Sequence, residues 1–239
     1  MENMRNRRNI KHGYARGWGI QFGDLKEKTL NDPLYRQAVS LITGRSVVSE
    51  DNRINLFLII RDYLKDIPAG DIIEFGSYKG GIAIFMATIA RQSHPKMKIY
   101  SLDTFAGMPE TDSAIDAHNK GDFADVDLDE LRRYAEGLGL SNLEFVRGPF
   151  EQTAESVLSR SKGVALAHID CDIYSSVAYS YDVVKPRMVD GGYVVFDDAL
   201  YSSCLGATEA VEDLAIRRDG LNCEQIFPHF VFRMFKDRR

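Results

Sequence analysis

The sequence predicts an α/β fold with a doubly wound, mostly parallel sheet. Short runs of Val, Ala, Leu, Ile and Phe lack polar alternation, and such runs are typical of strands that helices cover on both faces. The runs alternate with segments of helical spacing, which favours parallel strands joined by crossover helices. Two runs end in paired aspartates, Asp170 with Asp172 and Asp197 with Asp198. Because ligands of such sheets bind beyond the carboxyl ends of the strands, the pairs indicate an active site there.

Length and composition indicate one soluble domain over residues 1–239. No shift in composition divides the chain, which is long enough to bury a full α/β core. With a net charge of -5 it lacks the basic excess of nucleic-acid binders. No apolar stretch approaches the roughly 20 residues that span a bilayer, and the basic start lacks the hydrophobic segment of a signal peptide. We therefore expect no nucleic acid, no membrane and a cytoplasmic location. The widely spaced cysteines are expected to be reduced thiols, namely Cys171, Cys204 and Cys223.

The elements before the sheet are an arm and two helices. Residues 1–28 are basic and contain several glycines, and we expect a flexible arm, which either frays or acts as a lid facing the substrate. Residues 29–68 are expected to hold N-terminal helices, because apolar side chains recur at helical spacing over 32–43 and 50–66. Ser49 is the expected N-cap of the second helix.

Strands and helices then alternate to the end of the chain. Strands are expected over 71–76, 98–104, 143–148, 164–170 and 191–198. Helices are expected over 79–92, 128–138, 175–185 and 206–218. The final segment predicts two strands broken near Pro228 and His229, as an antiparallel edge. The long connection 105–127 is expected to be a lid insertion, since loops of that length in compact domains are usually functional or disordered.

A glycine-containing turn, E-F-G-S-Y-K-G-G, joins the first strand to its helix. Glycines allow a tight turn and close approach of a ligand, and the helix N-terminus favours negative charge. Tyr78 stands where the dinucleotide fingerprint has its second glycine, which disfavours a nicotinamide or flavin cofactor. Asp103 ends the second strand, where it could accept hydrogen bonds from both ribose hydroxyls of an adenosine. From these residues alone, an ordinary α/β turn with an aspartate at a strand end remains the alternative.

Six ordered segments extend this pattern. They are E-F-G-S-Y-K-G-G, S-L-D-T-F-A-G-M-P, G-D-F, R-G-P-F, H-I-D-C-D-I-Y-S-S and G-G-Y-V-V-F-D-D. Over residues 46–218 the chain resembles the macrocin-type (TylF-like) O-methyltransferases. These are class I S-adenosylmethionine-dependent enzymes with a Rossmann-like sheet, and many act on sugar hydroxyls of natural products. The resemblance implies the same fold, cofactor and reaction for this chain.

The resemblance also implies residues that hold the cofactor. The first-strand loop would hold its methionine part, through Glu74, Phe75, Gly76, Ser77 and Tyr78. Asp103 would take the ribose, and the adenine would lie near Thr104 and Phe105. The remaining implied contacts come from the lid insertion, Gly121, Asp122 and Phe123, and from the far side, Gly148 and Phe150. Ser46 and Val47 fall where the N-terminal helices of the family approach the cofactor, in place of its usual Thr-Met pair.

The same resemblance implies a role for the paired aspartates. It makes the strands 164–170 and 191–198 neighbours, about 4.8 Å apart, so their terminal carboxylates would converge. Crowded negative charges require either protonation or a cation, and oxygen-only ligands favour Mg²⁺. We assign Mg²⁺ to Asp170, Asp197 and Asp198. The alternative is that Asp172 and Asp198 only cap the helices that follow them.

The family match makes Asp172 the general base, with the metal orienting the hydroxyl for attack on the sulfonium methyl. Cys171 replaces the usual glycine between the two aspartates and is expected to be a packing residue. His168 projects to the same face as Asp170 and is expected to be a hydrogen-bonded sheet residue. The loop histidines His118 and His229 either touch the acceptor or are ordinary polar residues.

The expected function is Mg²⁺-dependent transfer of a methyl group from S-adenosylmethionine to a hydroxyl of a small metabolite. A sugar of a natural product or a nucleotide sugar is the first choice of acceptor. A catechol or phenol acceptor is the second, and a catalytically inactive S-adenosylmethionine-binding module is the third alternative. The resemblance also implies a homo-oligomer. The residues leave open which acceptor, and which of its hydroxyls, is methylated.

Overall fold

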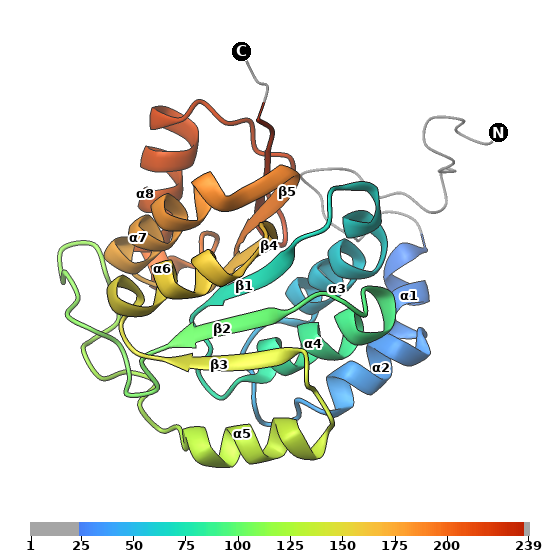
Figure 1. The fold of residues 1–239 in the computed structure, drawn as a ribbon. Helices are drawn as coiled ribbons and strands as arrows, with labels where there is room; N and C mark the ends of the chain where they lie inside the picture. The colour runs from blue at the N-terminus through green and yellow to red at the C-terminus, as the bar shows by residue number, and fades with distance from the viewer. Residues whose placement is uncertain (1–23, 237–239) are drawn as a thin grey trace.

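The computed structural model of the protein describes residues 24–236, so most of the expected arm over residues 1–28 lies outside the described residues. The described strands form one sheet in the order β3-β2-β1-β4-β5-β6 (Figure 1). Neighbours pair in parallel except β5 with β6, which is antiparallel. The predicted fold class is therefore confirmed. The strands span Asp71–Phe75, Ile99–Asp103, Leu143–Arg147, Val164–Ile169, Met188–Phe196 and Phe230–Met234, in order from β1 to β6.

The register of the parallel strands brings their carboxyl ends to one edge. Phe75 at the end of β1 pairs with Ile169 of β4, and Ile169 pairs with Phe196 of β5. The ladder continues past the strands, because the amide of Asp170 donates to the carbonyl of Phe75 and the amide of Asp197 donates to that of Ile169. The residues that follow β1, β4 and β5 are thus held side by side by backbone hydrogen bonds.

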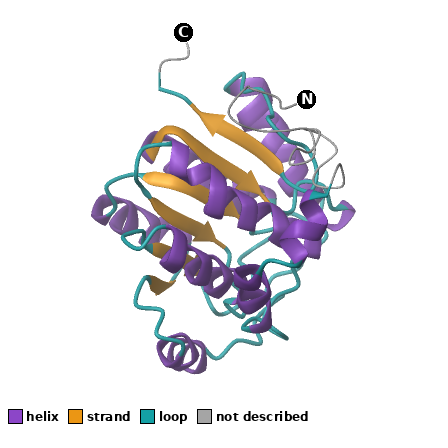
Figure 2. Ribbon diagram, turned by 90° about the vertical axis from the view of Figure 1, so that its right-hand side faces the viewer, coloured by secondary structure: helices purple, strands orange, loops and turns teal. Residues whose placement is uncertain are grey.

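Helices cover both faces of the sheet (Figure 2). One hydrophobic cluster packs the N-terminal helices, α4 and α5 against one face, and a second packs α6, α7 and α8 against the other. Successive side chains of β1 point to opposite faces of the sheet, so Ile72 belongs to the first cluster and Ile73 to the second. The helices are α1 Leu25–Leu30, α2 Pro33–Ser40, α3 Glu50–Leu58, α4 Gly81–Ser93, α5 Leu128–Gly137, α6 Phe150–Arg160, α7 Tyr174–Val184 and α8 Leu205–Ala210.

Short helical segments of other types extend several of these helices. Two π-helical segments, Ile59–Tyr63 and Val211–Arg218, continue α3 and α8. Three 3₁₀ turns complete the set, at Leu64–Asp66, Lys185–Arg187 and Ser202–Cys204. The predicted N-cap of α3 is confirmed, because the Ser49 hydroxyl accepts a hydrogen bond from the amide of Asn52 at 3.2 Å. No described helix is long and apolar enough to cross a membrane.

Three elements differ from the sequence prediction. Helix α6 was not expected, although Ala154, Val157 and Leu158 give it a buried apolar stripe at helical spacing. Helix α1 was not expected either, since it begins inside the segment assigned to the arm. The prediction of two C-terminal strands is wrong. One strand, β6, is preceded by a single bridge between Gln225 and Val231, and Pro228 has no amide hydrogen with which to extend that pairing.

Candidate active site

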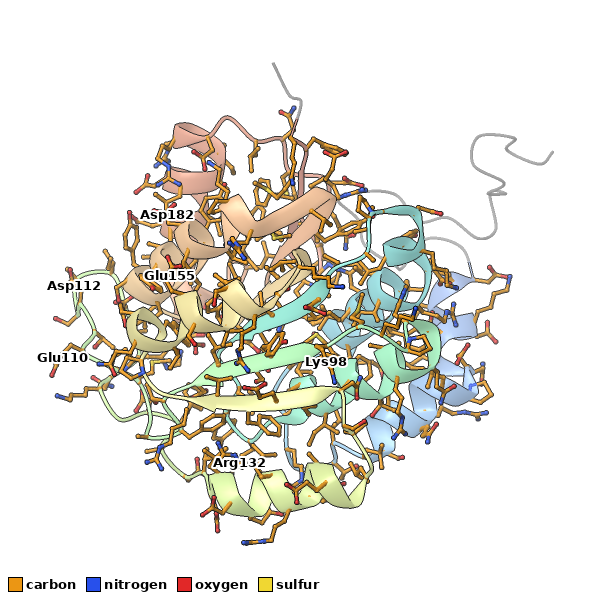
Figure 3. The ribbon with its side chains drawn as sticks, viewed as in Figure 1. Lys98, Glu110, Asp112, Arg132, Glu155 and Asp182 are labelled. Atoms are coloured by element: carbon orange, nitrogen blue, oxygen red, sulfur yellow. The ribbon has the colours of Figure 1, made fainter. Side chains whose placement is uncertain are left out.

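A cavity of about 580 Å³ opens beyond the carboxyl ends of β1, β2, β4 and β5. The connection from β2 to α5, residues 105–127, hereafter the lid segment, runs beside this edge (Figure 1). Glu110 and Asp112 mark its outer part in Figure 3, beyond the arrowheads of the strands. The cavity therefore lies where the paired aspartates and the glycine turn predicted a site.

Gly76 follows β1 in a conformation that only glycine adopts easily, with φ of +90°. A Cβ atom at this position would lie 1.7 Å from the carbonyl oxygen of Asp170. The missing side chain lets the turn after β1 pass against the start of the acidic segment after β4. Gly76 therefore allows the turn after β1 to lie directly against the residue that follows β4.

Asp103 organises the turn at this end of the cavity. Its Oδ2 accepts hydrogen bonds from the amides of Ser77 at 2.7 Å and Tyr78 at 2.9 Å, and its Oδ1 accepts one from the amide of Phe105 at 2.7 Å. The Thr104 hydroxyl is 3.4 Å from Oδ1 but donates its single hydrogen to a loop carbonyl at 2.8 Å. Since a carboxylate has about four acceptor positions, one remains on Oδ1 for a hydroxyl of a ligand.

The residues implied to hold the cofactor fall into two groups. Those that line the cavity are Gly76, Ser77, Tyr78, Asp103, Thr104, Phe123 and Phe150, together with Ser46 and Val47. Those outside the lining are Glu74, Phe75, Phe105, Gly121, Asp122 and Gly148. In the second group Glu74, Phe75 and Phe105 are buried in the fold, whereas the side chain of Asp122 is exposed. Phe75 makes an edge contact with Phe150, with ring centroids 5.3 Å apart, and Glu74 accepts a hydrogen bond from the Ser101 hydroxyl inside the sheet at 2.5 Å.

The opposite end of the cavity is acidic. One carboxylate oxygen from each of Asp170, Asp197 and Asp198 lies within 4.8 Å of the others. Burial, followed by the charges of neighbouring carboxylates, raises the pKa of Asp170 and of Asp198 well above the usual range. Such crowding is what a cation relieves, and a set of oxygen donors suits a hard cation such as Mg²⁺. The residues present therefore fit the expected metal.

A buried network fixes the orientation of Asp197. Its Oδ1 accepts hydrogen bonds from Asn52 at 3.0 Å and His229 at 2.7 Å and meets Nε2 of His168 at 3.3 Å. Burial alone would raise the pKa of Asp197, but the two histidines hold it below its usual range. His168 also lies 3.5 Å from Glu74. Burial would lower the pKa of His168, but the two carboxylates raise it to about 9. The expectation of a hydrogen-bonded sheet histidine is confirmed.

Asp172 stands beside the acidic trio and faces the cavity. Its backbone is in the left-handed region, with φ of +60°, and its amide donates to Oδ2 of Asp198 at 2.9 Å. Its Oδ1 accepts a hydrogen bond from the Cys204 thiol at 3.4 Å and lies 3.6 Å from Nε2 of His118. Burial raises the pKa of this carboxyl. A carboxylate with a raised pKa in a cavity is suited to accept a proton.

The lid segment is attached to the far side of the cavity by one buried carboxylate. Oδ1 of Asp116 accepts a hydrogen bond from the amide of Tyr174, at the start of α7, at 3.0 Å. It packs against Gly206 in α8, where a Cβ atom would lie 2.0 Å from the same oxygen. Two residues farther along the lid segment, His118 lines the cavity. The attachment therefore fixes where His118 approaches Asp172.

Several site residues had weak or no sequence signal. His229 was expected in a loop, but β6 returns antiparallel to β5 and buries it against Asp197. Asn52 and Asp116 gave no signal beyond being polar residues in helical or loop segments. The sequence identified Cys204 only as a reduced thiol. The turn that leads into α8 places it beside Asp172. Two polar residues within apolar strands, Glu74 and His168, were the available clues to the network across the sheet.

Comparisons with known proteins agree on one family. The family model described as Macrocin-O-methyltransferase (TylF) matches residues 42–220. A relative from Streptomyces olivaceus, 8-demethyl-8-(2,3-dimethoxy-alpha-L-rhamnosyl)-tetracenomycin-C 4'-O-methyltransferase, is 28% identical over 163 residues. That match covers 64% of this chain and only 62% of the relative. A relative from Micromonospora griseorubida, mycinamicin III 3''-O-methyltransferase, is 23% identical over 223 residues, or 80% of this chain and 87% of the relative.

A solved structure gives the same result for the fold. The O-methyltransferase NovP superposes with a TM-score of 0.65 at 23% sequence identity, over 77% of this chain and 80% of NovP. This likeness supports the α/β architecture.

Proposed function

The chain belongs to the macrocin O-methyltransferase family, and we propose that it transfers a methyl group from S-adenosylmethionine to a hydroxyl of a small metabolite. The observation that carries the proposal is the arrangement of one cavity. The glycine turn and Asp103 form one end, and four aspartates gather at the other. A nucleoside site beside a metal and a base is what methyl transfer to a weakly acidic hydroxyl requires.

We infer that the cofactor occupies the end built by Gly76 and Asp103. The open acceptor position on Oδ1 of Asp103 would take one ribose hydroxyl, because its other positions already hold backbone amides. The aromatic rings of Phe123 and Phe150, which line the cavity, would cover the apolar surface of the ligand. Tyr78 makes an edge contact with Phe123, with centroids 5.1 Å apart, which ties the lid segment to the cofactor loop.

At the other end, Asp170, Asp197 and Asp198 would hold Mg²⁺. A divalent cation bound there supplies charge that stabilises the alkoxide developing on the acceptor. Asp172 takes the hydroxyl proton as the oxygen bonds to the methyl carbon, while the bond from that carbon to sulfur breaks with its electrons passing to sulfur. His168, His229 and Asn52 keep Asp197 oriented from behind. Their role is to position the carboxylate and not to contact the substrate.

The acceptor we favour is a sugar hydroxyl of a natural product or of a nucleotide sugar. Supporting this choice, the Streptomyces olivaceus relative is named for methylation of a compound that carries a rhamnosyl group. The Micromonospora griseorubida relative is named for a 3''-hydroxyl of mycinamicin III. Polar side chains on the acceptor side, including Ser175, Ser176 and Ser203, suit a hydroxyl-rich ligand.

Incubation with S-adenosylmethionine labelled in the methyl group tests the proposal. Panels of rhamnosides, other glycosides, nucleotide sugars and catechols would be compared, with Mg²⁺ and with a chelator. We expect labelled glycoside or nucleotide sugar only in the presence of Mg²⁺. Failure to bind S-adenosylmethionine in calorimetry would contradict the cofactor, and labelling of catechols alone would contradict the acceptor class.

A further inference from the structure

Three side chains of different chemistry meet at the edge of the acidic end. His118 comes from the lid segment, Asp172 follows β4, and Cys204 precedes α8. Sγ of Cys204 lies 3.4 Å from Oδ1 of Asp172 and 3.7 Å from Nε2 of His118. The third separation, between Nε2 of His118 and Oδ1 of Asp172, is 3.6 Å. All three residues line the cavity.

We propose that His118, Asp172 and Cys204 form a second metal site, which takes a borderline divalent cation, Zn²⁺ in particular. Zn²⁺ binds sulfur at about 2.3 Å and nitrogen or oxygen at about 2.0–2.2 Å in tetrahedral geometry, which separates its ligand atoms by roughly 3.3–3.6 Å. The three measured separations lie in or next to that range. Three protein ligands and a fourth position open to the cavity complete a four-coordinate site.

The donor set separates this site from the oxygen site beside it. Asp170, Asp197 and Asp198 offer only carboxylate oxygens, which suit Mg²⁺. A thiolate and an imidazole instead select Zn²⁺ and related transition metals over Mg²⁺. The cavity thus presents two neighbouring cation sites of different hardness, and neither shares a ligand with the other.

The metal-free arrangement already holds these ligands in place. Asp116 attaches the lid segment to the amide of Tyr174, which sets the position of His118. Burial raises the pKa of the Cys204 thiol, and in the metal-free state this thiol donates a hydrogen bond to Asp172. On binding, the thiol proton leaves to solvent and the sulfur electron pair goes to the metal. The cation replaces that proton between the same two atoms with little rearrangement.

Binding at this site would inhibit methyl transfer. A cation bound to Oδ1 of Asp172 would lower the basicity of this carboxylate, so that it takes the hydroxyl proton less readily, and an ion beside it would narrow the acceptor end of the cavity. This consequence rests on the proposed function, in which Asp172 is the base. The metal site itself does not rest on it, because its ligands and distances stand without any acceptor.

Co²⁺ titration of the full chain, stripped of metal by a chelator, tests the site directly. A cobalt–thiolate bond gives an intense near-ultraviolet charge-transfer band, so the readout needs neither S-adenosylmethionine nor an acceptor. We expect the band in the parent, its removal by Zn²⁺ and its survival in excess Mg²⁺. Cys204→Ser should lack the band, and His118→Gln should weaken Co²⁺ binding by more than about tenfold, as even outer-shell changes do at metal sites.

Cys223→Ser is the matched control, because this thiol contacts backbone carbonyls of Gln225 and Val231 and is not part of the cluster. It should keep the band, and circular dichroism should show all three variants folded. Absence of the band in the parent, or a band that persists in Cys204→Ser, would overturn the site. A band without Zn²⁺ inhibition of methyl transfer would retain the site and contradict the role of Asp172 as base.

Discussion

The two ends of the cavity each place an aspartate where a buried strand ends, but the two carboxylates have opposite surroundings. Asp103, the last residue of β2, accepts three hydrogen bonds from backbone amides of Ser77, Tyr78 and Phe105. Asp170 after β4 faces the charges of Asp197 and Asp198, and burial together with these charges raises its pKa well above the usual range. The same residue type is therefore surrounded by backbone amide donors at one end and by other carboxylates at the other.

Because of this difference, Asp103 holds the surrounding backbone in place, whereas Asp170 is the carboxylate that we propose binds a ligand. Amides that surround Asp103 gain from its charge and fix the turn that would hold the cofactor. The carboxylates around Asp170 repel one another, and either a proton or a bound cation relieves that repulsion. An aspartate at a strand end can thus stabilise the fold or bind a ligand, and its neighbours decide which.

The largest effect is expected at the acidic end, on the rate of transfer. Asp172→Asn removes the group that takes the proton and keeps its size, so we expect the transfer rate to fall by about 10²–10⁴-fold. S-adenosylmethionine affinity should be nearly unchanged, because we propose that the cofactor binds at the end built by Gly76 and Asp103. Single-turnover kinetics and calorimetry measure the two quantities, with Asp129→Asn on the exposed face of α5 as control. A variant that transfers as fast as the parent would mean that another group is the base.

Removal of one charge should shift stability in opposite directions at the two ends. Asp103→Asn should lower the free energy of unfolding by about 1.5–3 kcal/mol, the value of hydrogen bonds to a charged group. Asp170→Asn should raise the free energy of unfolding of the metal-free protein, because it relieves repulsion with Asp197 and Asp198. Urea denaturation with a chelator present measures both. Changes of the same sign would show that the two carboxylates have similar surroundings.

The pH dependence of stability tests the buried hydrogen-bond network that holds Asp197. The pKa of His168 is raised to about 9, above its unfolded value of about 6.5. Its stabilising contribution is therefore complete below about 6.5 and is lost as the pH rises through about 9. We expect the free energy of unfolding of the metal-free protein to fall over this window and His168→Gln to lack that fall. A parent that keeps its stability across the window would contradict the paired state of His168.

The smallest effect is expected where the lid segment attaches. Gly206→Ala places a methyl group against the carboxylate of Asp116, and overpacking of this kind costs about 1–3 kcal/mol. Gly137→Ala in α5 is the control, because nothing lies within 4 Å of its Cβ position. Denaturation of the two variants should differ by that amount. Equal stabilities would indicate that the lid segment moves aside without cost.

The sequence predicted the architecture because its signals are local. Apolar runs, the alternation of strands and helices, and the aspartates at strand ends all follow from short stretches of chain. Helix α6 was not predicted, although Val157 and Leu158 carry its apolar stripe. The prediction of two C-terminal strands was wrong. The residues on both sides of Pro228 have the pattern of a strand, but only those after it form a strand of the sheet.

The candidate site also has one part that the sequence could predict and another that it could not. The convergence of Asp170, Asp197 and Asp198 could be predicted because they follow two neighbouring strands, and the structure gathers their oxygens within 4.8 Å. That they hold Mg²⁺ stays a prediction. The contacts of His229, 32 residues from Asp197, and of His118, 54 residues from Asp172, depend on how β6 and the lid segment return to the sheet. No spacing rule links such pairs. They require the tertiary structure.

A crossed binding experiment tests the central claim that the cavity has two chemically separate ends. Calorimetry would measure S-adenosylmethionine and Mg²⁺ binding to the parent, Asp103→Asn and Asp170→Asn, each confirmed as folded. The account predicts that Asp103→Asn loses affinity for the cofactor and keeps Mg²⁺, while Asp170→Asn loses Mg²⁺ and keeps the cofactor. Equal loss of both ligands in both variants, or a parent that binds no Mg²⁺, would contradict it.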